Sequence, residues 1–258
     1  MPRFAANLTF LFTELPFLDR FAAAANAGFK AVESTNPYEA SAADIADRLK
    51  AHGLAMALIN TPAGSAAEGE RGLAALTGRE REFAVTLETA LRYSDVTGAR
   101  KIHVLAGLVH QGAQRATFVA NLKAAARVAA GAGVELLIEP INRRDIPGYF
   151  LNKTHEARSI IHEVAAPNVR LQFDLYHRQV EEGDVVMALG EFGPLAGHYQ
   201  VANPPDRGEP DDGELNYRAL FKLIDASGFD GWVGCEYRPR QGTVEGLRWA
   251  EACGVLLG

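Results

Sequence analysis

A single-domain (β/α)8 barrel, the TIM-barrel architecture, is predicted for residues 1–258 by three observations. Eight short apolar runs alternate with longer amphipathic segments, which is typical of parallel strands joined by helical crossovers. Dividing the 258 residues among eight units gives about 32 residues per unit, near the usual size for this fold. The main rival is a doubly wound open sheet, but neither G-x-G-x-x-G nor G-x-x-x-x-G-K-[ST] follows the first run. These patterns favour the closed barrel.

The strands are predicted where apolar residues come in short runs between turn-forming residues. No linker-like stretch, low-complexity tract or second domain interrupts the alternation. The longest connection without a strand, Thr61–Gly78, is rich in Gly, Ala and charged residues and is a candidate lid. In chain order the expected strands are Phe4–Leu8, Ala31–Ser34, Ala55–Asn60, Lys101–Leu105, Glu135–Glu139, Val169–Asp174, Gly197–Val201 and Gly231–Glu236.

The helical segments are predicted from periodicity and from their end signals. In residues 83–94 and 118–129, apolar side chains recur every three or four positions, which places them on one face of a helix. Ser41, Thr77 and Asn216 are expected to cap the starts of three helices. Glycines ahead of the next strand are expected to end the helices, namely Gly28, Gly53, Gly98, Gly133 and Gly228.

The composition excludes several classes of protein. Hydrophobic residues make up 48% and charged residues 22% of the chain, as in ordinary globular proteins, and the net charge of −6 argues against nucleic-acid binding. No run approaches the roughly 20 apolar residues of a membrane helix, and residues 4–13 lack the features of a signal peptide. The two cysteines, Cys235 and Cys253, suit a reducing compartment. We therefore expect a cytoplasmic protein with no membrane or nucleic-acid partner.

Polar side chains end four consecutive strands in the second half of the chain. They are Glu139, Asp174, Gln200 and Glu236, at intervals of 35, 26 and 36 positions. Because barrel active sites form at the C-terminal ends of strands, three carboxylates and one amide should converge at the mouth. Carboxylates held so close together require protons or a cation, and oxygen ligands suit Mg²⁺ or Mn²⁺ better than zinc. Each residue alone could be a helix cap or a salt-bridge partner, but four in succession favour a metal site.

Four further side chains are candidate substrate contacts. His177 lies just after the sixth strand, and His103 lies in the fourth strand near its mouth-facing end. Arg207 lies in a proline-stiffened loop after the seventh strand, and Arg71 lies in the candidate lid. An arginine can hold a carboxylate through two parallel hydrogen bonds, although a solvated surface position is the alternative for both. His198, one layer deeper in the seventh strand, is expected to be a hydrogen-bonded core residue.

Short segments throughout the chain carry a resemblance to a known family. They are Ile138–Asn142, Asp145–Leu151, Phe173–His177, Pro205–Pro210, Pro62–Gly64, Gly69–Gly72 and Gly213–Tyr217. Together they resemble the hydroxypyruvate isomerases, a family that includes 2-oxo-tetronate isomerases and belongs to the xylose-isomerase-like TIM barrel superfamily. The resemblance covers essentially the whole chain, and the combination is specific although each segment is short.

The resemblance implies roles for the residues at the strand ends. Glu139 and Glu236 would be the catalytic acid/base residues, and both would bind the metal together with Asp174 and Gln200. Many epimerases of the superfamily have histidine where Gln200 stands, so the glutamine favours the hydroxypyruvate isomerase branch. The implied reaction interconverts hydroxypyruvate and tartronate semialdehyde, or the related 2-oxo-tetronates, through a cis-enediolate with a divalent ion as Lewis acid. The expected partner is a small keto acid or sugar acid, and assembly into a homo-oligomer stays open.

Three other functions stay open on the sequence alone. One is a ketose 3-epimerase, or an inosose-type epimerase or dehydratase, on the same scaffold. Another is a phosphodiesterase of the endonuclease-IV type, which would need a histidine-rich multi-zinc cluster and a basic surface. The net charge of −6 and the few strand-end histidines disfavour it. A non-catalytic binding protein is disfavoured by two glutamates suited to acid–base chemistry.

Overall fold

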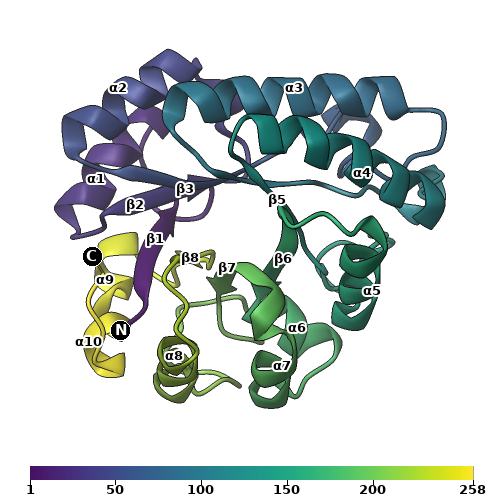
Figure 1. Ribbon diagram of the computed structural model, residues 1–258. Coiled ribbons are helices and arrows are strands. Elements are labelled where there is room, and N and C mark those ends of the chain that lie inside the picture. Colours follow the sequence, from purple (N-terminus) through teal and green to yellow (C-terminus); the bar gives the residue numbers. More distant parts are fainter. Residues whose placement is uncertain (258) are drawn as a thin grey trace.

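Eight parallel strands close into a barrel, and helices surround it (Figure 1). The computed structural model describes residues 1–257. Neighbouring strands in the sequence are neighbours in the sheet, and the last strand pairs with the first. The predicted (β/α)8 barrel in a single domain is therefore confirmed. The strands are β1 (Arg3–Asn7), β2 (Ala31–Ser34), β3 (Ala55–Asn60), β4 (Lys101–His103), β5 (Glu135–Ile138), β6 (Val169–Asp174), β7 (Ala196–Val201) and β8 (Trp232–Cys235).

The strands lie where the sequence predicts them, and the differences are confined to their ends. The bounds of β2, β3 and β6 are the predicted ones. The strands β5 and β8 end one residue earlier than expected, so Glu139 and Glu236 follow directly after them. At Glu139 the reason is the following residue, Pro140, which has no N–H to donate to the sheet. Both glutamates still lie at the C-terminal end of the barrel.

Helices cover the outside of the barrel, and each strand is followed by at least one of them (Figure 1). The two long helices α3 and α4 run side by side, and the C-terminal helices lie beside β1. No helix within residues 1–257 is long and apolar enough to cross a membrane. The helices are α1 (Arg20–Asn26), α2 (Ala42–His52), α3 (Glu80–Thr97), α4 (Arg115–Gly131), α5 (Thr154–Val164), α6 (Leu175–Glu181), α7 (Val185–Phe192), α8 (Tyr217–Ala226), α9 (Thr243–Gly246) and α10 (Arg248–Cys253).

The predicted helix ends are confirmed in most cases, with one exception. Ser41 caps α2 by accepting a hydrogen bond from the Asp44 backbone N–H, and Asn216 caps α8 in the same way. The expectation for Thr77 is wrong, because α3 begins only at Glu80 and has no side-chain cap. The Thr77 hydroxyl lies 2.8 Å from the Thr117 hydroxyl instead, so a tertiary contact replaces the local one.

Much of the apolar core lies between the barrel and its helices. Phe4 of β1 packs edge-on against Phe221 of α8 and Trp249 of α10, with ring centroids 5.0 and 5.3 Å apart. All three side chains are buried. Because burying one large apolar side chain contributes about 1.5–3 kcal/mol, this group holds the last helices against the first strand.

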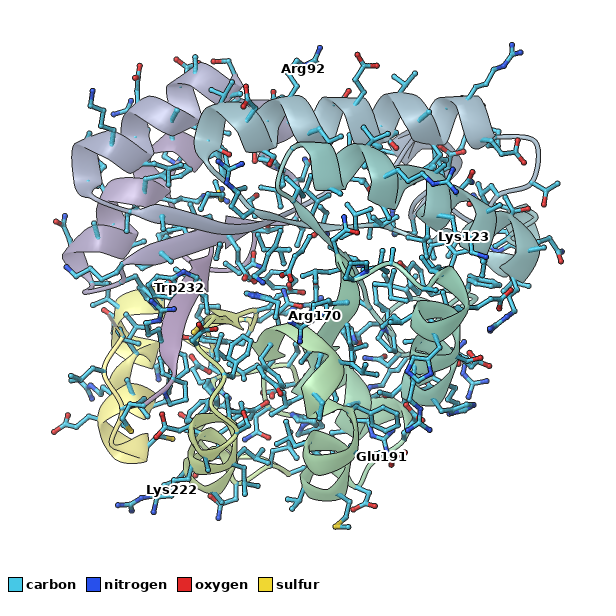
Figure 2. All side chains as sticks on the ribbon, viewed as in Figure 1. Arg92, Lys123, Arg170, Glu191, Lys222 and Trp232 are labelled. Atoms are coloured by element: carbon cyan, nitrogen blue, oxygen red, sulfur yellow. The ribbon has the colours of Figure 1, made fainter. Side chains whose placement is uncertain are left out.

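The inside of the barrel is filled by side chains (Figure 2). At the N-terminal ends of the strands, Arg170 donates hydrogen bonds to the carbonyls of Pro194 and Ala196, at 3.1 and 2.8 Å. These contacts join β6 to the start of β7 at the end of the barrel opposite the mouth. Buried polar and charged side chains gather toward the opposite end, where a barrel normally carries its active site.

The candidate lid, Thr61–Gly78, follows β3 and packs against the segment after β4. Its second half is anchored by a backbone bridge between Gly72 and Ala106, and residues 73–76 are buried. Gly72 has a φ of 114° and lies against the backbone of Leu105, where a side chain would collide. The second half of the segment is therefore held in place, and closure of the segment over a ligand stays a prediction.

Candidate active site

A cavity of about 290 Å³ opens at the C-terminal ends of the strands. Asp174 and Gln200 are buried beside it, at the ends of β6 and β7. The structure therefore brings the predicted site residues into one region, as expected for strand ends that meet at one mouth. The other predicted site residues line the cavity itself, namely Arg71, His103, Glu139, His177, Arg207 and Glu236.

Glu139, Asp174 and His177 form a cluster that could hold a metal ion. Each offers one ligand atom, and the three atoms lie within 4.8 Å of one another. Glu139 Oε1 and Asp174 Oδ2 are buried and accept no hydrogen bond from any residue in 1–257. Burying such oxygens without partners is costly, so a cation between them would complete the site. The donors thus fit a divalent ion, and the identity of the ion stays a prediction.

Arg207 lies among the carboxylates and balances part of their charge. One guanidinium nitrogen pairs with Glu236, and Nη1 lies 3.0 Å from Asp145 Oδ2. The guanidinium carbon also lies 4.8 and 5.0 Å from the ring centroids of Phe10 and Tyr176. The residue is 7% exposed and adopts a φ of 58°, which is uncommon for a residue with a side chain. Arg207 is therefore held in place by its neighbours, and its contact with a substrate carboxylate stays a prediction.

Burial raises the pKa of the carboxyls in this group. The pKa of Glu139 lies well above its usual range because of burial first and then because of the nearby Glu236 and Asp174. Burial raises the pKa of Glu236 to about 8 and that of Asp174 to about 6, although Arg207 opposes both shifts. These groups can therefore hold or release a proton near neutral pH, which exposed carboxyls cannot do.

Hydrogen bonds fix the orientation of the His177 ring. Asn142 Oδ1 accepts from the Asp145 backbone N–H at 2.7 Å, so the amide nitrogen of Asn142 faces the imidazole. Asn142 Nδ2 lies 2.6 Å from His177 Nδ1, which must accept because the amide nitrogen can only donate. Burial lowers the pKa of His177 well below its usual value. The ring is therefore neutral with its proton on Nε2, at 3.7 Å from Asp174 Oδ2 and 3.9 Å from Glu139 Oε1.

His103 reaches the cavity from β4. Its Nδ1 lies 3.4 Å from Glu139 Oε2, and the side chain is 1% exposed. Burial, together with the smaller effect of His198, lowers its pKa to about 3, so the ring is neutral at physiological pH. Neither ring nitrogen has a hydrogen-bond partner within residues 1–257. His103 is therefore placed to make a hydrogen bond to a ligand.

Sequence reasoning missed two residues at the ends of the first strands. Asn7 Nδ2 donates to Glu33 Oε1 and to Glu236 Oε2, both at 2.9 Å. Glu33 also lies 2.7 Å from His198 Nε2, which confirms His198 as a hydrogen-bonded core residue. Gln200 Nε2 donates to the same two glutamates. The strand-end rule that found Glu236 also selects Asn7. In β2 the same rule selects Ser34, so Glu33, one position earlier, is identified only by its contacts in the fold.

Arg71 differs from Arg207 in its surroundings. It is exposed at the rim of the cavity, and one guanidinium nitrogen donates to the Glu70 carbonyl at 3.1 Å. Within the described part of the chain it pairs with no carboxylate. Its charge is therefore available to a ligand, whereas that of Arg207 is shared among Glu236 and Asp145.

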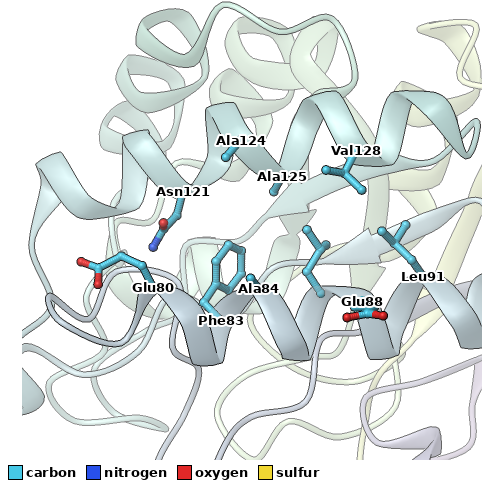
Figure 3. Close-up of a pocket in the computed structure, with 10 residues that line it drawn as sticks. Glu80, Phe83, Ala84, Glu88, Leu91, Asn121, Ala124, Ala125 and Val128 are labelled. Carbon is cyan, nitrogen blue, oxygen red and sulfur yellow. The ribbon is translucent and has the colours of Figure 1, made fainter.

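A second hollow of about 370 Å³ lies outside the barrel, between α3 and α4 (Figure 3). Its walls are mainly apolar and include Phe83, Leu91 and Val128. Of its polar side chains, Asn121 donates to the Ala74 carbonyl at 2.9 Å, and Glu80 and Glu88 are exposed to solvent. The buried carboxyls with raised pKa values line the cavity at the barrel mouth, so that cavity is the candidate active site.

Comparison with known proteins shows which family the chain is similar to. The family model described as xylose isomerase-like TIM barrel matches residues 21–253. The chain is 54% identical to a 2-oxo-tetronate isomerase of Cupriavidus necator, over 96% of this chain and 97% of the relative. It is 43% identical to a hydroxypyruvate isomerase of Escherichia coli, over 97% of this chain and 99% of the relative.

A solved structure is similar over nearly the whole chain. It is described as an AP endonuclease, family 2, from Brucella melitensis, and it is 45% identical with a TM-score of 0.95. The match covers 98% of this chain and 99% of that one. The family resemblance read from the sequence is confirmed, and the protein is an enzyme of the isomerase class. The chain therefore belongs to the xylose isomerase-like TIM barrel family.

Proposed function

We propose that this enzyme interconverts hydroxypyruvate and tartronate semialdehyde, or the homologous four-carbon 2-oxo-tetronates. The observation that carries the proposal is the pair Glu139 and Glu236, two buried carboxyls with raised pKa values that line one cavity. The names of the relatives from Cupriavidus necator and Escherichia coli support this substrate class.

The reaction moves a carbonyl between neighbouring carbons. One glutamate, as the carboxylate, takes the proton from the carbon next to the carbonyl, and a cis-enediolate results. The other glutamate, as the carboxylic acid, delivers a proton to the former carbonyl carbon. Proton transfer between the two enediolate oxygens completes the isomerisation. A positioned acid or base contributes about 10²–10⁴-fold when its pKa lies near the working pH. Burial raises the pKa of Glu139 and brings that of Glu236 to about 8.

A divalent ion fits the oxygen-rich end of this site, and we propose Mg²⁺ or Mn²⁺. Glu139 and Asp174 would hold it through their unpartnered oxygens. The ligand roles of Glu236 and Gln200 stay predictions, since Gln200 Oε1 already accepts a hydrogen bond from Gln172 Nε2. When bound, such an ion polarises a carbonyl and stabilises negative charge on oxygen. With its proton on Nε2, His177 suits a donor to a substrate oxygen better than a metal ligand.

The substrate carboxylate needs a cation at the rim. Arg71 is exposed there, while Arg207 lies deeper and is shared with Glu236. We therefore assign the substrate carboxylate to Arg71 first. Arg207 would hold Glu236 and contact the substrate oxygens nearer the reacting carbons. Its bidentate geometry still makes it the alternative partner for the carboxylate.

The test is turnover by the purified protein with hydroxypyruvate and 2-oxo-tetronates, with and without Mg²⁺ or Mn²⁺. A panel of ketoses tests the epimerase alternative. An oligonucleotide with an abasic site tests the endonuclease activity named in the description of the Brucella melitensis protein. Metal-dependent isomerisation of a keto acid is expected. Turnover of ketoses or cleavage of the oligonucleotide in its place would refute the proposal.

A further inference from the structure

A fully buried carboxylate lies beneath the cavity without lining it. Glu33, in β2, is 0% exposed, and it is absent from the cavity wall. Its Oε2 lies 2.7 Å from His198 Nε2. Its Oε1 accepts hydrogen bonds from Asn7 Nδ2 and Gln200 Nε2, both at 2.9 Å. A buried carboxylate is costly unless it is paired, and Glu33 is paired on both oxygens.

The two amides that contact Glu33 also contact Glu236. Asn7 Nδ2 donates to Glu236 Oε2 at 2.9 Å, and Gln200 Nε2 donates to the same oxygen. An amide nitrogen carries two hydrogens, so each amide can bridge the two glutamates. Gln200 Oε1 accepts from Gln172 Nε2 at 2.6 Å, so its amide is held at both ends.

We propose that Glu33 is a positioning residue for Glu236 and acts through Asn7 and Gln200. A carboxylate can only accept hydrogen bonds, so Glu33 draws the nitrogen end of each amide toward itself. The second hydrogen of each nitrogen then holds Glu236 Oε2. This leaves Glu236 Oε1 on the side of Arg207, facing the cavity. The inference rests on the acid–base role of Glu236 proposed above.

The neighbouring strand makes room for this arrangement. Gly234 of β8 lies against the Glu33 carboxylate, and a Cβ at this position would collide with it. Glycine inside a strand is unfavourable and often marks the close approach of another group. The His198 ring, also 0% exposed, fixes the other oxygen of Glu33. The contacts with Gly234 and with the His198 ring therefore keep the Glu33 carboxylate in a fixed position next to the amides of Asn7 and Gln200.

The first test is the Glu33→Gln variant of the full-length enzyme, assayed with saturating Mg²⁺ or Mn²⁺. The amide keeps the shape but removes the negative charge and one of the two acceptor oxygens, so the hydrogen bonds that Asn7, Gln200 and His198 make to this position become weaker. We expect kcat for keto acid isomerisation to fall about 10-fold or more, with KM within about 2-fold of the wild type. In the Glu236→Gln background, the same change should cause no further loss of solvent-deuterium exchange into the substrate, because the group it positions is gone.

Two further variants separate positioning from stability. Asn168→Ala removes two hydrogen bonds, to the carbonyls of Ala126 and Val134, at the N-terminal ends of the strands and away from the cavity, so it should lower Tm and leave kcat unchanged. Asn7→Ala keeps the pair of Glu33 with His198 and removes one bridge, so it serves if Glu33→Gln fails to fold. It should lower kcat by a few-fold in the wild type and not in the Glu236→Gln background.

The outcomes distinguish this inference from the proposed function. Unchanged turnover in Glu236→Gln would refute the acid–base role and the positioning with it. If kcat falls in Glu236→Gln, but the Glu33→Gln and Asn7→Ala variants fold and keep the kcat of the wild type, the positioning role of Glu33 is refuted and the proposed function stands. A loss from Glu33→Gln that is as large in the Glu236→Gln background as in the wild type would show a structural role and would also overturn the inference.

Discussion

At the scale of single residues, Glu139 illustrates how position changes an ordinary carboxyl. It is 5% exposed and lies 3.4 Å from His103 and 3.9 Å from His177. Both rings are neutral because burial lowers their pKa, so neither compensates a charge on Glu139. The same side chain on the surface would be ionised at neutral pH. Burial thus makes a proton on Glu139 stable and transferable in the metal-free protein.

The Glu139→Gln variant should lower kcat by about 10²-fold or more, because the amide cannot transfer a proton. The fold should survive, since the amide is nearly isosteric. Glu139 is also a proposed metal ligand, so exchange of solvent deuterium into the substrate should be measured at saturating Mg²⁺. Near-normal exchange and turnover in this variant would show that Glu139 is not the acid or base.

The two arginines should respond differently to substitution. Arg71→Ala should raise KM for hydroxypyruvate several-fold and change kcat little, because its charge is exposed and binds only the ligand. Arg207→Lys should lower kcat, because a lysine cannot contact Glu236 and Asp145 together. Steady-state kinetics of both variants check this, with Arg143→Ala, whose side chain is 61% exposed and pairs with Glu181, as a control. The reverse pattern would make Arg207 the carboxylate partner.

At the scale of elements, the loop that follows β3 is built around one buried acid. Glu70, which is 3% exposed, accepts a hydrogen bond from the Ser65 backbone N–H at 2.6 Å and pairs with Arg79 at 2.7 Å. These contacts fold the loop back on itself, and Arg71 is the next residue in the chain. The position of Arg71 at the rim therefore depends on the anchoring of the loop.

Glu70→Ala should lower the free energy of unfolding by about 1–3 kcal/mol, because it leaves the half-buried Ser65 backbone N–H and the Arg79 guanidinium without this partner. It should also raise KM, because Arg71 loses its fixed support. Glu82→Ala is the matched control, since Glu82 pairs with the same Arg79 but is exposed. Glu82→Ala should change neither the free energy of unfolding nor KM measurably. Urea unfolding and steady-state kinetics measure both effects, and equal behaviour of the two variants would contradict the anchoring.

At the scale of the whole molecule, closure of the barrel brings distant parts of the chain together. Asn7 and Glu236, which share a hydrogen bond, are 229 positions apart in the sequence. The pairing of β8 with β1 makes this contact. It gathers acidic groups in one buried region, so the stability of the metal-free protein depends on pH.

The metal-free protein should lose stability as the pH rises from about 5 to 8. The folded-state pKa is about 6 for Asp174 and about 8 for Glu236, above the ordinary values of 3.8 and 4.5. The folded chain therefore binds more protons in this range, so the free energy of unfolding falls with increasing pH. Urea unfolding in chelator measures the slope. Asp174→Asn, which can still cap α6, should have a shallower slope, and an unchanged slope would exclude Asp174 as a source.

The stabilisation that a bound metal ion provides should increase with pH, whereas the stability of the metal-free protein decreases. Binding requires ionised carboxylates, so Mg²⁺ or Mn²⁺ should raise Tm more at pH 8 than at pH 5. Removing the ion with a chelator should abolish isomerisation, and adding either ion should restore it. Thermal scans and turnover of the same preparation check both statements. Full activity of rigorously metal-free protein would rule out a catalytic ion.

The strands and several site residues could be predicted because their signals are local. Glu139, Asp174, Gln200 and Glu236 follow apolar runs, and a strand shorter by one residue leaves them at the same end of the barrel. The cap expected at Thr77 failed because that signal competes with a contact to Thr117, 40 positions away. Local patterns carry no information about such partners.

The sequence by itself determined the alternation of strands and helices, the barrel, and the acidic residues at its mouth, because each depends on residues that are neighbours in the chain. Only the tertiary structure decided which groups touch. It placed Arg207 against Glu236, fixed the orientation of His177 through Asn142, and placed Glu33 against the amide of Gln200. The pKa shifts also belong to the folded state, because burial and the distance between charges arise only when remote segments pack together.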